Sequence, residues 1–293
     1  MGYSAYSPVT VADDGSTHVE LSEDHPGVSD PVYRQRRDEL ASIAASWRRG
    51  EPIPNPDYTD EEHEVWRIVS GELQDLHEKY ASEAFQRGKA DLKLTTQYIP
   101  GLGEVTSGLE PLVDFRYQPI AGLAPVRDFY GSFSEGVFWS TQYLRHPSVP
   151  LYTPEPDIIH EVIGHANQIA DPTFAHIYRL VGEAVHRTKD EEALKFLSQV
   201  FWYTMEFGVV KEKGELRAYG AGILSSVGET ETFRSATVRP VDLVEMGTVD
   251  YDITHYQPLL YGFSSPGELE DVLTDFFAYF DDTYHEELLA KAS

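Results

Sequence analysis

The chain has 293 residues, of which 49 are Asp or Glu and 23 are Lys or Arg, so its formal net charge at pH 7 is −26. Nucleic acids and anionic membranes repel such a polyanion, and no apolar run approaches the roughly 18 residues of a membrane span, so we expect neither partner. The chain has no cysteine, which excludes disulfides and thiolate ligands and leaves His, Asp and Glu to hold any metal. A small-molecule substrate and a cytoplasmic location fit this composition.

The helix signals begin after a polar segment of 29 residues. Residues 1–29 show no sustained hydrophobic period, so we expect a flexible N-terminal arm or a loosely docked segment, with residues 30–293 forming a single domain. Asp30 and Pro31 predict the start of an amphipathic helix that ends before Gly50. Thr59 and Glu62 form the pattern of a capping box that opens a long helix to about Arg87. The arginines of the first helix are interleaved with acidic residues and predict a solvated face; they are Arg34, Arg36, Arg37, Arg48 and Arg49.

The second half of the chain predicts a site framed by helices. Residues 100–157 are dense in Gly, Pro and aromatic residues, and long loops of this kind usually line a site. Helical periodicity returns at about 155–169, 173–187 and 190–209, a β-like stretch follows at 215–226, and a last helix runs from Pro266 to about Leu289. The sequence therefore predicts a mainly α protein with small β elements.

Two histidines in TPEPDIIHEVIGH predict a metal site. Thr153 is a plausible N-cap, with Pro154 and Pro156 in the first turn, so His160 and His165 would project from one helix. Their spacing places them about 140° apart on an ideal helix, and both reach one ion only if the helix is widened near Gly164. Glu206, an ionisable residue in the apolar segment QVFWYTMEFGVV, is the expected third ligand.

The residue types alone leave three interpretations open. Two imidazoles and one carboxylate suit a non-haem Fe(II) centre that activates O₂. The same residues also fit core histidines with Glu206 paired to an arginine, or a zinc-dependent hydrolase with Glu161 as its base. A non-catalytic, acidic metal-binding protein is a further alternative.

Four stretches resemble one enzyme family. TQYLRH, YTPEPDIIHEVIGH, FWYTMEFG and AYGAGILSSVGE, in this order between about Arg116 and Tyr261, resemble the catalytic domain of the pterin-dependent aromatic amino acid hydroxylases. The resemblance implies a mainly α catalytic domain that uses Fe(II), a tetrahydropterin such as tetrahydrobiopterin, and O₂. The implied reaction hydroxylates the ring of an aromatic L-amino acid, with phenylalanine to tyrosine expected first and a tyrosine or tryptophan hydroxylase as the alternative.

The resemblance also assigns residues. It implies Fe(II) at His160, His165 and Glu206, and Glu161 facing the pterin. It places Arg145 on the substrate carboxylate with Asp157 orienting it, Thr153 and Ser225 on the substrate backbone, and Pro156, Trp202 and Phe207 around the substrate ring. For the pterin it implies stacking on Phe129, backbone contacts along residues 122–127, which include Gly122, Leu123 and Val126, and Trp139 beside pterin and metal.

Three residues depart from the family pattern, and one feature of it is missing. Trp139 stands where the family has His or Gln, Phe201 replaces a tyrosine near the iron, and Gly262 falls where members distinguish tyrosine from phenylalanine. The acidic end, residues 281–293, has no heptad pattern of the kind that forms a tetramerisation helix. We therefore expect a monomer.

Overall fold

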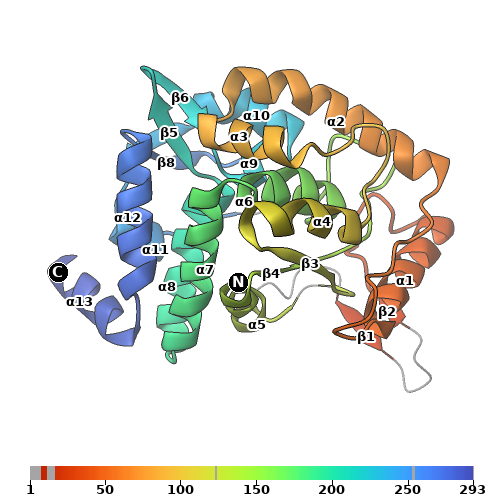
Figure 1. Cartoon of the computed structure of the whole chain (residues 1–293), viewed down its shortest axis with the longest axis horizontal. Coiled ribbons are helices and arrows are strands. Elements are labelled where there is room, and N and C mark those ends of the chain that lie inside the picture. Colours follow the sequence, from red (N-terminus) through yellow and green to blue (C-terminus); the bar gives the residue numbers. More distant parts are fainter. Residues whose placement is uncertain (1–7, 12–16, 123, 253–254, 293) are drawn as a thin grey trace.

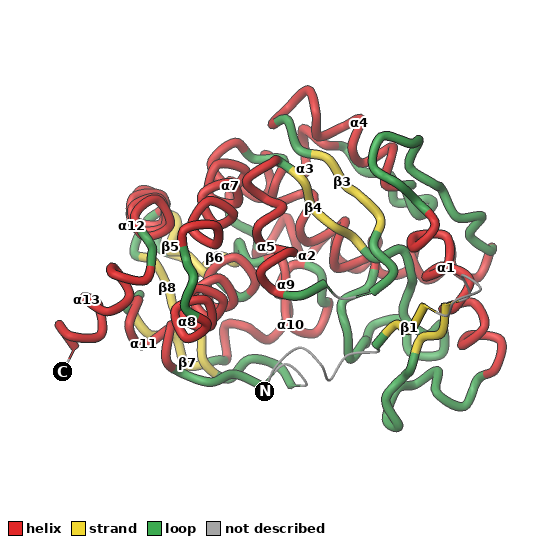
Figure 2. Tube along the Cα trace, turned by 90° about the horizontal axis from the view of Figure 1, so that it is seen from below, coloured by secondary structure: helices red, strands yellow, loops and turns green. Residues whose placement is uncertain are grey.

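The computed structural model describes residues 8–11, 17–122, 124–252 and 255–292. Helices form most of the molecule, and three small sheets lie among them (Figures 1 and 2). The mainly α prediction is thus confirmed. Among the described residues, none of the helices has the length and apolar character that crossing a bilayer requires.

The N-terminal segment is folded onto the domain where it is described. Strands β1 (Val9–Val11) and β2 (Thr17–Val19) pair antiparallel, and β2 packs on helix α1 (Pro31–Ser46) (Figure 1). Val19 is 5% exposed and His25 is 3% exposed, because Asp38 of α1 accepts the Val19 N–H at 2.7 Å and His25 faces Glu155. The expected flexible arm is therefore wrong for residues 17–29.

Helix α1 begins as predicted, but its arginines do not form one solvated face. The Asp30 carboxylate accepts the N–H groups of Val32 and Tyr33 at the start of the helix. Arg37 is only 3% exposed and donates to Glu155 at 2.6 Å. The buried partner explains the difference, since a guanidinium can be buried when it is ion-paired.

The predicted long helix is two helices. The capping box of Thr59 and Glu62 opens α2 (Asp60–Tyr80), and α3 (Glu83–Leu92) follows. Between them, Ala81 forms a β-bridge with Ala218 and Ser82 N–H donates to the Ala218 carbonyl at 2.7 Å. Because these backbone groups bond to another segment, the helix breaks although the sequence there contains no Pro or Gly.

The loop-rich middle of the chain holds a two-stranded parallel sheet between short helices. Strand β3 pairs with β4 from Arg116 opposite Val137 to Pro119 opposite Ser140. The elements of this region are α4 (Leu102–Val113), β3 (Arg116–Pro119), α5 (Val126–Ser132), the 3₁₀ turn η2 (Phe133–Glu135) and β4 (Val137–Ser140).

The two-histidine helix starts later than predicted. It begins at Ile158 rather than near residue 155, because the Asp157 carboxylate accepts the His160 N–H at 3.2 Å and takes the capping role expected of Thr153. Its elements and those that follow are the π-helical η3 (His160–Ala166), α6 (Asn167–Ile169), α7 (Pro172–Arg187), α8 (Glu191–Phe201) and the π-helical η4 (Trp202–Glu206).

A four-stranded sheet in the order β6-β5-β8-β7 and the last helices complete the domain. The predicted β-like stretch is a strand only to Ala218, after which the chain turns into a helix. The last helix is broken at Phe280–Asp281, where Arg187 donates to the carbonyls of Phe277, Ala278 and Phe280. These elements are β5 (Val209–Glu212), β6 (Glu215–Ala218), α9 (Ala221–Leu224), α10 (Val227–Thr232), η5 (Phe233–Ser235), β7 (Thr237–Pro240), α11 (Leu243–Thr248), β8 (Leu259–Phe263), α12 (Pro266–Tyr279) and α13 (Asp282–Ala292).

Candidate active site

Three side chains from two helical segments meet with the donor atoms of a metal site. His165 Nε2 lies 3.0 Å from His160 Nε2 and 3.1 Å from Glu206 Oε1, and His160 Nε2 lies 3.6 Å from Glu206 Oε2. One donor atom of each residue lies within 4.8 Å of the other two. Two imidazole nitrogens and a carboxylate oxygen on one side of a point suit a divalent iron with open positions, so these residues fit the metal that the sequence predicts.

Local helix geometry explains the unusual spacing of the histidines. His160 and His165 both lie in η3, whose π-helical hydrogen bonds run from i to i+5 and bring residues five apart onto one face. The predicted widening near Gly164 is confirmed. Glu206 ends the second π-helical turn, η4, after α8. The irregular turns therefore bring the three side chains to one point.

Gly164 also allows a close approach between η3 and α9. A Cβ at this position would lie 2.7 Å from the Ala221 carbonyl oxygen and 3.2 Å from Ser225 Cβ. Only a residue without a side chain leaves room for α9 at this distance. The contact brings Ser225 to His160.

Hydrogen bonds select the tautomer of both histidines. Ser225 Oγ donates to the Ala221 carbonyl at 2.7 Å and so accepts from His160 Nδ1 at 2.9 Å. Tyr178 Oη donates to Gln168 Oε1 at 2.5 Å and so accepts from His165 Nδ1 at 2.6 Å. With both Nδ1 atoms protonated, both Nε2 lone pairs face the centre.

Protonation states match the role of ligands. Burial lowers the pKa of His160 to about 4 although the Glu206 charge opposes this, so the imidazole is neutral at pH 7. Burial alone would raise the pKa of Glu206, but His165, His160 and the Gly222 N–H lower it below its usual value. Neutral imidazoles and an ionised carboxylate are the forms that bind metals.

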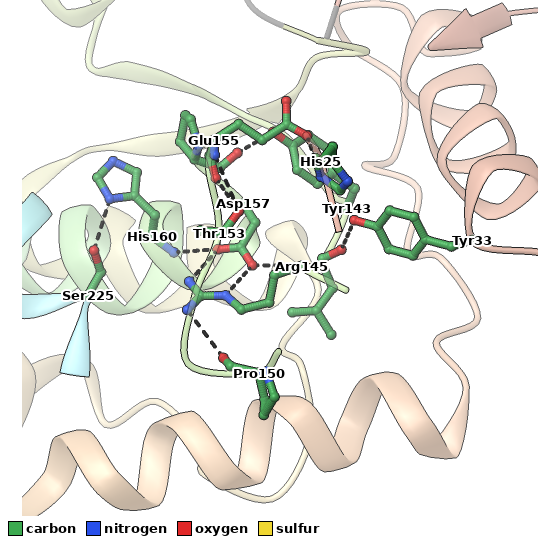
Figure 3. Close-up of polar contacts among 12 residues, drawn as sticks. His25, Tyr33, Tyr143, Arg145, Pro150, Thr153, Glu155, Asp157, His160 and Ser225 are labelled. Carbon is green, nitrogen blue, oxygen red and sulfur yellow. Dashed lines mark hydrogen bonds and ion pairs between the residues drawn. The ribbon is translucent and has the colours of Figure 1, made fainter. Parts of the chain in front are cut away.

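A buried ion pair holds Arg145 beside the centre (Figure 3). Arg145 Nε and Nη2 donate to the two oxygens of Asp157 at 2.8 and 2.9 Å, and the Arg145 backbone N–H donates to Oδ2 at 2.9 Å. Burial would raise the pKa of Asp157, but Arg145 lowers it below its usual value. Nη1, whose contact with the Pro150 carbonyl is long at 3.4 Å, keeps donor capacity for a ligand.

One cavity of about 230 Å³ unites most of the predicted site residues. Asp157 lies behind Arg145 rather than on the wall, and Leu123 lies outside the described residues. Among the departures from the family pattern, Trp139 lines the cavity, whereas Phe201 is core and Gly262 pairs with Val209 inside a sheet. The predicted residues on the wall are Gly122, Val126, Phe129, Trp139, Arg145, Thr153, Pro156, His160, Glu161, His165, Trp202, Glu206, Phe207 and Ser225.

The geometry disagrees with two of the alternative interpretations. Glu206 pairs with the histidines and has no arginine partner among the residues described, so the reading as a structural salt bridge is wrong. Burial and the charges of Glu206 and Asp157 raise the pKa of Glu161 well above its usual range. A hydrolase base must be ionised to accept a proton from water at pH 7, and the raised pKa opposes the ionised form of Glu161.

Several residues at the site carry no sequence signal of their role. Tyr178 and Gln168 sit among apolar residues of α7 and α6 and read as core positions, yet they orient His165. Glu229, a cavity wall residue, lies in the short helix α10 that the sequence does not predict. The alternation of acidic residues in that segment suggests only an exposed face.

Comparisons with known proteins identify the family of the chain. Residues 12–287 match the family model described as biopterin-dependent aromatic amino acid hydroxylase. The chain is 41% identical over 269 residues to phenylalanine 3-hydroxylase of Streptomyces coeruleorubidus, which covers 92% of this chain and 96% of the relative. It is 42% identical over 248 residues to phenylalanine-4-hydroxylase of Dictyostelium discoideum, which covers 83% of this chain and 56% of the relative. The chain thus spans a little over half of the Dictyostelium protein.

Solved structures show the same fold. The apo phenylalanine hydroxylase of Colwellia psychrerythraea superposes with a TM-score of 0.73 at 28% identity, covering 81% of this chain and 90% of that one. The Chromobacterium violaceum enzyme, solved with iron(III) and 7,8-dihydrobiopterin, superposes with a TM-score of 0.73 at 25% identity over 82% and 90% of the two chains. With a family model that matches nearly its whole length, the chain belongs to the biopterin-dependent aromatic amino acid hydroxylases.

Proposed function

We propose that this chain hydroxylates the aromatic ring of L-phenylalanine with O₂, using one Fe(II) and a tetrahydropterin. The observation that carries the proposal is the convergence of His160, His165 and Glu206 on one point beside Arg145, a cation placed for an amino acid carboxylate. Both curated relatives described above act on phenylalanine by name, and the Chromobacterium enzyme holds iron and a biopterin.

The substrate carboxylate binds Arg145 in this proposal. The Asp157 pair fixes the plane of the guanidinium, so its remaining N–H donors point in a set direction for a bidentate contact. Thr153 and Ser225 lie on the same wall. The ring then lies between Pro156, Trp202 and Phe207, where the Trp202 and Phe207 rings pack at a centroid distance of 4.5 Å.

The pterin stacks on Phe129 in this proposal. Phe129 packs edge-on against Phe133 and Phe138, with centroids 5.0 and 5.4 Å away, and these contacts hold its ring for stacking on a flat ligand. Burial and neighbouring negative charges raise the pKa of Glu161 well above its usual range, which favours the protonated form that can donate a hydrogen bond to a pterin nitrogen. Trp139 adds an indole to the cavity lining.

When bound, the iron supplies O₂ activation with electrons from the pterin. The protein orients the proposed ligands and excludes water. Ser225 and Tyr178 fix the two imidazole rings, and the cavity walls are mostly apolar. A water-poor cavity protects a reactive oxidant from side reactions.

Product analysis tests the proposal. Purified protein is incubated with Fe(II), tetrahydrobiopterin, O₂ and, separately, L-phenylalanine, L-tyrosine or L-tryptophan, and the products are separated by chromatography. Hydroxylated phenylalanine is the expected product. An iron-loaded protein that converts none of it would overturn the proposal.

The same assay assigns the ring position. The resemblance implies the 4-position, which gives tyrosine. The Streptomyces relative, which aligns over nearly the full length of both chains, is named a 3-hydroxylase, so the 3-position is the second candidate. Tyrosine and meta-tyrosine elute separately, and their ratio decides between the two.

We also propose that the protein works in the cytoplasm as a monomer. Fe(II) and tetrahydropterins are readily oxidised, so a reducing compartment suits them. The charge of −26 opposes self-association, and α13 carries acidic residues without a heptad repeat. Light scattering coupled to gel filtration tests the monomer, with a mass near 33.0 kDa expected.

A further inference from the structure

Glu229 is a buried carboxylate on the cavity wall that the proposed function has not used. It lies in α10 and is 6% exposed. Its Oε1 accepts the backbone N–H of Gln257 at 2.9 Å, and within the described part of the chain no Lys, Arg or His pairs with it. Buried carboxylates are normally paired with a cation or a metal, so the missing partner calls for an explanation.

Each of the other carboxylates on the cavity wall already has a partner or an assigned role. Glu155 pairs with Arg37 at 2.6 Å, and Glu206 faces the two histidines. Glu161 is assigned to the pterin in the proposed function. Of the carboxylates that the described wall residues contribute, Glu229 is therefore the one available for a cation that enters the cavity.

An amino acid brings such a cation. It enters as a zwitterion, and burying its ammonium group without a partner carries a large desolvation cost. Arg145 receives the carboxylate end in the proposed function. Ser225 ends α9 and Glu229 lies in the first turn of α10, four residues further along, and both line the cavity.

We infer that Glu229 binds the α-ammonium group of the substrate and so restricts the site to amino acids. The inference rests on the proposed function, because it takes the carboxylate end to lie at Arg145. An ammonium–carboxylate hydrogen bond is charge-assisted and stronger than a neutral one. Glu229 would thereby distinguish an amino acid from a carboxylic acid that carries the same ring but no amino group.

The titration of Glu229 agrees with this role. Burial raises the pKa of Glu229 to about 7, although the Gln257 N–H opposes the shift. A bound ammonium ion would favour the ionised form and lower that pKa. If the side chain at position 229 only accepted the Gln257 N–H, a neutral acceptor such as an amide oxygen would do so equally well.

Glu229→Gln separates these two roles, because the amide oxygen still accepts the Gln257 N–H while the charge is lost. Binding of L-phenylalanine and of 3-phenylpropanoate, which lacks the amino group, is measured by calorimetry on the Fe(II)-loaded protein without O₂. Glu231→Gln is the matched control, since Glu231 is exposed on the same helix. Iron content and melting temperature report on the integrity of each variant.

The wild type should bind L-phenylalanine at least about tenfold more tightly than 3-phenylpropanoate. Glu229→Gln should weaken L-phenylalanine binding about 10- to 100-fold and leave 3-phenylpropanoate within about twofold, with Glu231→Gln like the wild type. Equal affinity of the wild type for both ligands overturns the inference, even if the variant does not fold. Unchanged discrimination in Glu229→Gln also overturns it. If either result is obtained while the wild type binds and converts L-phenylalanine, only the role of Glu229 is refuted. If the wild type binds no L-phenylalanine, the proposed function is refuted as well.

Discussion

Replacing Tyr178 by Phe should weaken the metal centre from a position that does not touch the metal. The Tyr178 hydroxyl accepts from His165 Nδ1 at 2.6 Å and donates to Gln168 Oε1 at 2.5 Å. Burial raises the pKa of Tyr178 well above its usual range, so the O–H is retained. Tyr178→Phe removes both hydrogen bonds and frees the imidazole to rotate or to change its tautomer.

The magnitude follows from the two buried groups that lose a partner. Each unsatisfied group costs about 1–3 kcal/mol, so the metal-free protein should lose about 2–6 kcal/mol of unfolding free energy. Loss of a hydrogen bond that orients a ligand typically reduces metal affinity by about 10- to 100-fold. The stability change is expected whether or not His165 binds a metal, whereas the change in Fe(II) affinity is expected only if it does.

Two measurements check this prediction. Urea unfolding of the metal-free protein gives the stability change, and anaerobic Fe(II) titration against a competing chelator gives the affinity. Tyr279→Phe serves as the control because Tyr279 is exposed. An affinity for Fe(II) within about twofold of the wild type in folded Tyr178→Phe would refute the claim that this hydroxyl positions a metal ligand.

Three further predictions follow from packing and charge. Gly164→Ala should lower the unfolding free energy by about 1–3 kcal/mol in urea titrations, because the new Cβ would press on α9. The control Gly71→Ala, in an open part of α2, should raise the unfolding free energy by about 0.5–1 kcal/mol. Equal effects of the two substitutions would contradict the packing argument. Arg37→Met should cost about 3–5 kcal/mol because it leaves buried Glu155 without its arginine, whereas exposed Arg34→Met should change little, and a small loss in both would count against the ion pair. Burial lowers the pKa of His77 to about 3, so His77 binds a proton less readily in the folded protein than in the unfolded chain. The unfolding free energy should therefore fall as the pH drops from about 6.5 towards 3, by up to about 1.4 kcal/mol per pH unit. His77→Gln should flatten that slope in urea titrations at pH 5 to 7.

The three candidate metal ligands were predictable because their chemistry is local. A spacing of five residues between His160 and His165 does not fit an ideal helix, so the sequence itself requires the widened turn that η3 provides. The second π-helical turn was not predictable, since residues 202–206 read as a continuation of the preceding amphipathic helix. Glu206 stood out only because a charge interrupts an apolar run.

Interruptions of helices depended on distant segments. No residue near Ala81 breaks a helix by its own propensity, and the break follows from the Ala218 carbonyl, 137 positions further along the chain. The N-terminal segment was misread for the same reason. Its polar composition conceals His25, which, like Arg37 of α1, is buried beside Glu155.

The residues that orient the ligands were the hardest to identify. Tyr178 occupies the apolar face of α7, where an aromatic residue is expected for packing alone. Gln168 lies on a different element, and its amide also donates to the carbonyls of Met205 and Tyr219. Only the folded chain brings these groups to His165.

Metal stoichiometry tests the central claim most directly. Anaerobic titration of the protein with Fe(II) should give one tightly bound ion per chain in the wild type, and Glu206→Ala should lose that ion while its circular dichroism spectrum stays unchanged. Glu229→Gln, which alters the same cavity outside the proposed ligand set, should keep it. Undiminished binding of one ion by folded Glu206→Ala would contradict the assignment of His160, His165 and Glu206 as the metal centre.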